Sequence, residues 1–71
     1  MIHFSRHARE RMLERHISIP LVKKIIENLP NIRHIEGDKF ICYDMVQGRK
    51  LVIIFLKCKQ EITIITAYYE N

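Results

Sequence analysis

Apolar residues near the start of the chain recur with the spacing of an amphipathic helix. The segment 2–4 precedes this pattern and is expected to form a short edge strand. Ser5 is a suitable N-cap for a helix that ends near Arg15, because its hydroxyl can accept a hydrogen bond from a free backbone N–H. The residues predicted on the buried side of this helix are Ala8, Met12 and Leu13.

A second helix is predicted directly after the first. Ser18 can cap it, and Pro20 falls in its first turn, where the missing N–H leaves no hydrogen bond unmade. Segment 28–31 contains a proline and ends the helix. The predicted apolar stripe consists of Leu21, Val22, Ile25, Ile26 and Leu29, opposite Lys23, Lys24 and Glu27.

From residue 32 onward the pattern changes to that of β-strands. Strands are predicted at 32–36, 39–46, 51–58 and 62–69, with turns at 37–38, 47–48 and within 57–61. Segment 51–58 begins with an uninterrupted apolar run, which indicates a central strand buried on both faces. We therefore expect a single α+β domain over residues 1–71, with two N-terminal helices on one face of an antiparallel sheet of three to four strands. The other face is a candidate surface for a partner, a second copy of the chain or a substrate.

The composition predicts a folded protein and favours anionic partners. Of the 71 residues 48% are hydrophobic, and the net charge of +4 favours a polyanion or an acidic protein without choosing between them. Cys42 and Cys58 are interpreted as reduced core residues, because a secreted domain of this size usually carries more cysteines. No signal peptide precedes the first helix, and the longest apolar run is too short to cross a bilayer, so a cytoplasmic protein is expected.

The most informative feature is a column of basic side chains on the first helix. Each four-residue step rotates by about 40° in a helix, so His7, Arg11 and Arg15 would stack on one side. Two permanent cations beside a titratable ring suit the binding of a phosphate and the movement of a proton near it. Local ion pairs with Glu10 and Glu14 are the alternative explanation. Like charges four residues apart destabilise an isolated helix slightly, which a bound anion would offset, and we favour the functional interpretation.

The remaining histidines predict less. His16 falls just after the first helix, at the C′ position, where a left-handed backbone is common and a capping role is expected. His3 and His7 are four residues apart, but Ser5 interrupts the helix between them, and no cysteine or acidic residue completes a ligand set. We expect no metal and no cofactor.

Tyrosines and basic residues on the strands form a second candidate group. Tyr43 and Tyr68 could donate to a phosphate or stack on a base, or could be ordinary amphipathic aromatics at a sheet edge. Thr66 and Tyr68 are expected to share a face with Ile62 and Ile64. Two basic residues at a strand end are candidate phosphate contacts, or simply solvated edge residues; they are Arg49 and Lys50.

The segment 7–18 has the spacing H-A-x-x-R-M-x-x-R-x-I-S, and the last strand contains I-I-T-A-Y. It resembles small uncharacterised bacterial and archaeal domains with the signature H-A-x-x-R-M-x-x-R-G-I-S, which are similar in length and element order to the RelE/ParE and BrnT toxins of type II toxin–antitoxin modules. His16 stands where the signature has Gly, which implies mild strain in the turn between the helices. The resemblance implies a compact α+β ribonuclease without a metal, held inactive by an antitoxin encoded beside it. The catalytic residues of RelE-type toxins do not align one by one with this chain.

Three hypotheses follow. The first is a metal-independent endoribonuclease acting on RNA, ribosome-associated messenger RNA included, in which a base takes the 2′-hydroxyl proton and an acid protonates the leaving 5′-oxygen. His7 would transfer the proton, Arg11 and Arg15 would stabilise the phosphate, and Tyr68 or Tyr43 would supply the second donor. The RNA-binding residues would be Arg49, Lys50 and Tyr43. The second hypothesis is a non-catalytic module that binds nucleic acid or protein, and the third is self-association through the second sheet face.

Overall fold

The computed structural model describes residues 1–28 and 31–70. The predictions for Leu29 and Pro30 therefore lie outside the described residues. The elements follow the order β1 (Ile2–Phe4), α1 (Arg6–Glu14), α2 (Ile19–Asn28), β2 (Arg33–Glu36), β3 (Lys39–Val46), β4 (Arg49–Cys58) and β5 (Glu61–Glu70). The helices and the strands thus lie where the sequence pattern placed them, to within a few residues.

The described strands form one five-stranded sheet in the order β1-β5-β4-β3-β2. β1 runs parallel to β5, with Ile2 opposite Ile62 and Phe4 opposite Ile64, and all other neighbours are antiparallel. The α+β class is confirmed, but the prediction of an antiparallel sheet of three to four strands is corrected to a mixed sheet of five. The parallel pair joins the first strand of the chain, which precedes both helices, to the last strand.

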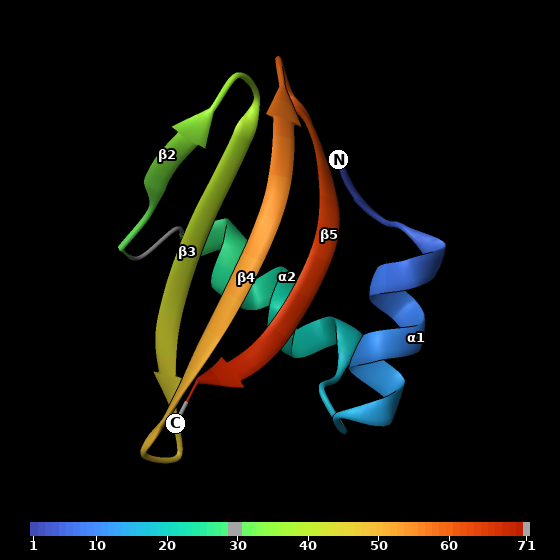
Figure 1. The fold of residues 1–71 in the computed structure, drawn as a ribbon, viewed down its shortest axis with the longest axis vertical. Helices are drawn as coiled ribbons and strands as arrows, with labels where there is room; N and C mark the ends of the chain where they lie inside the picture. Colours follow the sequence, from blue (N-terminus) through green and yellow to red (C-terminus); the bar gives the residue numbers. More distant parts are fainter. Residues whose placement is uncertain (29–30, 71) are drawn as a thin grey trace.

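The two helices lie on one side of the sheet (Figure 1). α2 crosses behind the central strands, and α1 lies beside β5. Burial in α2 is confined to the predicted stripe, with Val22, Ile25 and Ile26 inaccessible and Lys23 exposed. None of the described helices is long and apolar enough to cross a membrane.

Both ends of α1 have well-formed caps. The Ser5 hydroxyl accepts a hydrogen bond from the Ala8 backbone N–H at 3.0 Å, which confirms the predicted N-cap. After the helix, His16 has a φ of 56°, and the Ile17 N–H donates to the Met12 carbonyl at 2.9 Å. These are the features of a Schellman turn, so His16 occupies the predicted C′ position. One prediction in this helix is wrong: the side chain of Leu13 is 80% exposed. It follows buried Met12 by one residue and is therefore turned about 100° away.

The core lies between the helices and the sheet. β4 is the central strand, as predicted, and its residues 51–53 and 55 are buried. Cys42 is buried in this core, but Cys58 is exposed at the end of β4, so the prediction that both cysteines are core residues is wrong for Cys58. β4 ends there because the chain turns through Lys59, which has a φ of 58°.

The sheet face away from the helices is called the open face below. Tyr43, Val52 and Tyr68 lie in register across β3, β4 and β5 on this face. Val52 is only 2% exposed between the two tyrosines, whereas Met45 and Leu56, farther out, are 57% and 41% exposed. The open face therefore carries apolar side chains, as expected from the sequence.

A β-bulge in β5 changes which residues belong to the open face. Ile64 pairs with Phe55, but Thr66 pairs with Ile54, so Ile65 is an extra residue on β5. Side chains alternate strictly along a strand, and one extra residue reverses every later position. Ile64 and Ala67 both enter the core, and the prediction that Thr66 and Tyr68 share a face with Ile62 and Ile64 is wrong.

Candidate functional site

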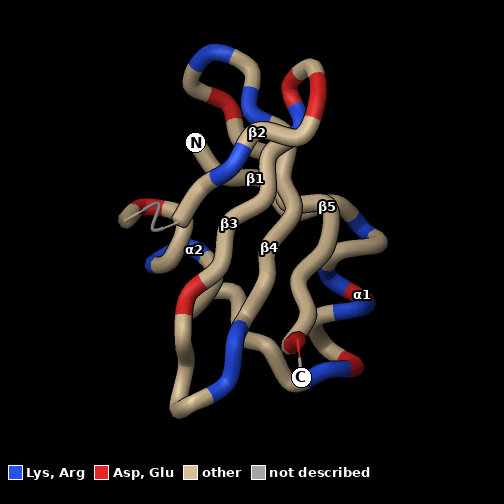
Figure 2. Tube along the Cα trace, turned by 60° about the vertical axis from the view of Figure 1, so that its left-hand side comes forward, with Lys and Arg blue, Asp and Glu red and all other residues tan. Residues whose placement is uncertain are grey.

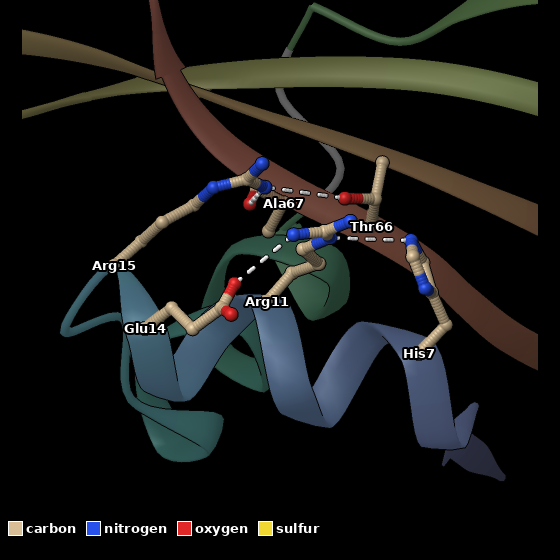
Figure 3. Close-up of polar contacts among 6 residues, drawn as sticks. All are labelled: His7, Arg11, Glu14, Arg15, Thr66 and Ala67. Atoms are coloured by element: carbon tan, nitrogen blue, oxygen red, sulfur yellow. Dashed lines mark hydrogen bonds and ion pairs between the residues drawn. The ribbon is translucent and has the colours of Figure 1, made fainter.

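The basic column on α1 faces β5 (Figure 3). Arg11 lies in the middle: its Nε is 3.5 Å from the His7 Nε2, and its Nη1 is 3.2 Å from the Glu14 Oε1. An arginine donates only, so in this arrangement His7 Nε2 is the acceptor and the ring proton sits on Nδ1. The predicted neighbours His7 and Arg11 are therefore in contact.

Arg15 is engaged differently from the other two. Its Nη1 donates to the Ala67 carbonyl oxygen at 2.9 Å and lies 3.4 Å from the Thr66 hydroxyl (Figure 3). The three side chains point to the same side of the helix, but Arg15 is fastened to the backbone of β5. A guanidinium has five N–H donors, so the Nε and Nη2 groups of Arg15 remain for an anion.

The alternative explanation, local ion pairing, is partly correct. Glu14 pairs with Arg11 within the column, whereas Glu10 pairs with Arg6 at 3.3 Å and stays outside it. The side chain of Arg11 is 45% exposed and that of Glu14 is 61% exposed. Exposed pairs of this kind contribute about 0–1 kcal/mol, so Glu14 does not prevent Arg11 from meeting a stronger anion such as a phosphate.

The strand residues of the predicted site fall on two different faces. The Lys50 Nζ lies 4.2 Å from the centre of the Tyr43 ring and 3.4 Å from the Glu70 Oε1, all on the open face. The Arg49 guanidinium lies 3.9 Å from the centre of the Tyr69 ring on the face that the helices cover. Adjacent residues of a strand point in opposite directions, which separates Arg49 from Lys50.

Tyr68 is the predicted site residue on β5. It shares the open face with Tyr43, one strand removed across Val52, and with Thr66, two residues earlier on β5. Because Arg15 reaches Thr66, the column of α1 and the open face meet at this point of β5. Figure 2 shows basic and acidic residues interspersed on α1 and a basic start of β4.

The histidines outside the column have structural partners. His3 Nε2 and Glu61 Oε1 are 2.7 Å apart, and His34 Nε2 lies 2.8 Å from the Gly37 carbonyl oxygen. The hydrogen bond from His3, with the N-terminal ammonium nearby, holds the pKa of Glu61 below its ordinary value of 4.5. Over residues 1–28 and 31–70, no three histidine, cysteine or acidic side chains are grouped to hold a metal ion.

Thr66, the Ala67 carbonyl and Glu70 are contacts that the sequence reasoning missed. The I-I-T-A-Y segment is part of the resemblance, but nothing in the spacing of residues shows that Arg15 reaches it across the fold. In chemical terms, the column offers an imidazole able to accept a proton, with guanidinium donors on the same side of the helix.

A protein-family profile described as Domain of unknown function (DUF4258) matches residues 4–69. No curated protein and no solved structure matches the chain. The matched span begins in β1, ends at the penultimate residue of β5 and includes the whole basic column. The chain therefore belongs to the DUF4258 family.

Proposed function

We propose that this protein is a toxin-like, metal-independent endoribonuclease. The observation that carries the proposal is the exposed contact between the His7 ring and the Arg11 guanidinium, 3.5 Å apart. An imidazole can take or give a proton in general acid–base catalysis, and an adjacent guanidinium can hold the phosphate at which the proton is transferred. Segment 7–18 resembles the signature of small uncharacterised domains that are similar in length and element order to the RelE/ParE and BrnT toxins, and this resemblance supports the same class of reaction.

The reaction needs one base, one acid and a stabilised phosphorane. Arg11 turns from His7 to the phosphate, which frees the His7 Nε2. This nitrogen takes the proton of the 2′-hydroxyl, whose oxygen forms a bond to phosphorus while the bond to the 5′-oxygen breaks. Arg11 donates to a non-bridging oxygen, and the free N–H groups of Arg15 add to it. The leaving 5′-oxygen takes a proton from Tyr68, giving a 2′,3′-cyclic phosphate and a 5′-hydroxyl. Tyr68 is preferred to Tyr43 because it lies on β5, the strand that Arg15 contacts.

The partner proteins belong to the same proposal. A toxin-like nuclease requires an antitoxin, and the net charge of +4 favours one with an acidic binding segment. A second copy of the chain is the other partner considered, and it would cover the exposed apolar residues of the open face, such as Met45 and Leu56.

The test compares RNA cleavage by the full chain and by matched histidine variants. Single-stranded RNA is incubated with the protein in the presence of a metal chelator, and the products are examined for 2′,3′-cyclic phosphate ends. His7→Ala and Arg11→Ala should each slow cleavage by about 100-fold or more. His16→Asn, which removes a histidine from the turn after α1 but tolerates a positive φ, should cleave like the wild type.

Two results would contradict the proposal. Equal cleavage by the wild type and His7→Ala would show that His7 does not move the proton. RNA binding without cleavage, with an affinity that falls steeply with salt, would favour the non-catalytic binding module.

A further inference from the structure

The open face contains a depression of about 330 Å³. Its floor includes Ile41 and Val52, and its rim includes Arg33 at the start of β2, Tyr43, Lys50 and Glu70. The volume falls in the range of sites for small organic ligands, which are mainly apolar with a few polar groups at the edge. The depression lies on the opposite side of the sheet from α1 and is a place where a second part of an RNA chain could be held.

The charges at the rim favour an anion. Lys50 and Glu70 form a solvent-exposed pair at 3.4 Å, so Arg33 leaves one positive charge in excess. Lys50 also lies over the Tyr43 ring at 4.2 Å, which holds its ammonium above an aromatic surface. Because the pair with Glu70 is exposed, a phosphate can compete for Lys50 at small cost.

From these features we infer that the depression binds one nucleotide of single-stranded RNA. The planar base lies on the apolar floor against the side chain of Tyr43, and the phosphate lies between Arg33 and Lys50. An acidic peptide would match the cations, but it would leave the apolar floor and the ring of Tyr43 without a planar partner.

The position of the depression fits an RNA that also meets the column of α1. Tyr43, Val52 and Tyr68 are in register, so Tyr43 at the depression and Tyr68 on β5 are two strand spacings apart, roughly 10 Å. Arg15 reaches Thr66, two residues before Tyr68. An RNA strand crossing from Arg15 to Tyr43 would pass Tyr68. The inference deepens the proposed function, on which it rests for the identification of the nucleotide as part of an RNA.

The test is a titration of the isotope-labelled full chain with adenosine 5′-monophosphate, followed by the backbone amide signals in NMR spectra. The amides of Ile41, Tyr43 and Val52 should shift and saturate. Inorganic phosphate and adenosine, added separately, should bind more weakly than the nucleotide, because each lacks half of the contacts. The spectra also report whether each variant is folded.

Matched variants identify the contributing groups. Arg33→Gln and Lys50→Gln should each weaken nucleotide binding about fivefold or more, while Lys24→Gln, which removes an equal charge from the exposed side of α2, should leave it unchanged. Tyr43→Leu keeps an apolar side chain beside Val52 and should weaken binding of the nucleotide but not of phosphate.

Several results would overturn the inference. These are amide-signal shifts confined to α1, equal affinity for phosphate and nucleotide, equal binding of a hexaglutamate peptide to the same amides, or no saturation at millimolar nucleotide.

The result of the binding experiment can be distinguished from the result of the cleavage experiment. If the nucleotide binds in the depression but His7→Ala cleaves RNA like the wild type, the proposed mechanism fails and the binding site stands. If cleavage depends on His7 but Lys50→Gln binds the nucleotide normally, the binding site fails alone.

Discussion

Arg15 and Ala67, 52 residues apart along the chain, are joined by a 2.9 Å hydrogen bond from the Arg15 Nη1 to the Ala67 carbonyl oxygen. Among the described strands, β1 covers β5 only at residues 62–64, so at Ala67 the strand has a neighbour on one side alone. Arg15 therefore ties the end of α1 to the part of β5 that β1 does not reach. It is a structural residue as well as a proposed phosphate ligand.

Replacing Arg15 should lower stability measurably. Arg15→Ala leaves the Ala67 carbonyl without this donor, and a lost hydrogen bond from a charged group costs about 1–2 kcal/mol of unfolding free energy. Urea unfolding followed by circular dichroism would measure the change. Arg9→Ala, at an exposed position of the same helix, is the matched control and should change stability by less than about 0.5 kcal/mol. Equal stability of the two variants would show that the bond contributes nothing.

The helices and their caps could be predicted because the signals are local. Ser5 and Ser18 each accept a hydrogen bond from a backbone N–H three residues later, at 3.0 and 3.2 Å. The apolar stripe of α2 follows directly from the helical period. The left-handed backbone at His16 followed from its position after the helix.

What could not be predicted depends on distant pairing. The three residues of β1 give no indication that they lie beside β5 rather than β2, because strand neighbours are decided by the packing of the whole sheet. No turn residue or glycine near Ile65 indicates a bulge in the sequence, yet the bulge moves the side chains of Thr66 and Tyr68 to the opposite face of the sheet. The candidate site was therefore predictable on α1 and only partly on the strands.

The turn after α1 should be improved by glycine. A left-handed backbone costs a residue with a side chain roughly 1–2 kcal/mol, and glycine avoids this cost. Glycine loses more backbone entropy on folding, however, which takes back about 0.5–1 kcal/mol of the stability gained. His16→Gly should therefore raise the unfolding free energy by about 0.5 kcal/mol or slightly more. His16→Val should lower it by at least about 1 kcal/mol, since a β-branched residue is disfavoured at positive φ. A loss of stability in His16→Gly would mean that the imidazole makes a stabilising contact, and denaturant midpoints would decide.

The contact between His3 and Glu61 should make stability depend on acid pH. Because the pKa of Glu61 is lowered in the folded state, its contribution is fully present above the ordinary value of 4.5 and is lost as the pH falls through the folded-state value. The wild type should therefore be more stable than Glu61→Gln near neutral pH, and the difference should shrink and then vanish as the pH falls below 4.5 and through the folded-state pKa of Glu61. Glu27→Gln, on the exposed side of α2, is the control and should show no such convergence. A constant difference between the wild type and Glu61→Gln across this range would contradict the assignment.

The two cysteines should differ sharply in reactivity. Burial, with a smaller effect from Asp44, raises the pKa of Cys42 to about 11, whereas Cys58 is exposed at the end of β4. Only thiolates react readily with a disulfide reagent, so at pH 8 the native protein should expose one fast thiol, and Cys42 should react at least about 100-fold more slowly. Cys58→Ser should then react only as fast as the protein opens, and urea should make Cys42 in this variant as reactive as a free thiol. Cys42→Ser should keep the fast phase unchanged. Rapid reaction of both thiols in the native wild type would mean that the sheet opens around Cys42 far more often than its packing under α2 implies.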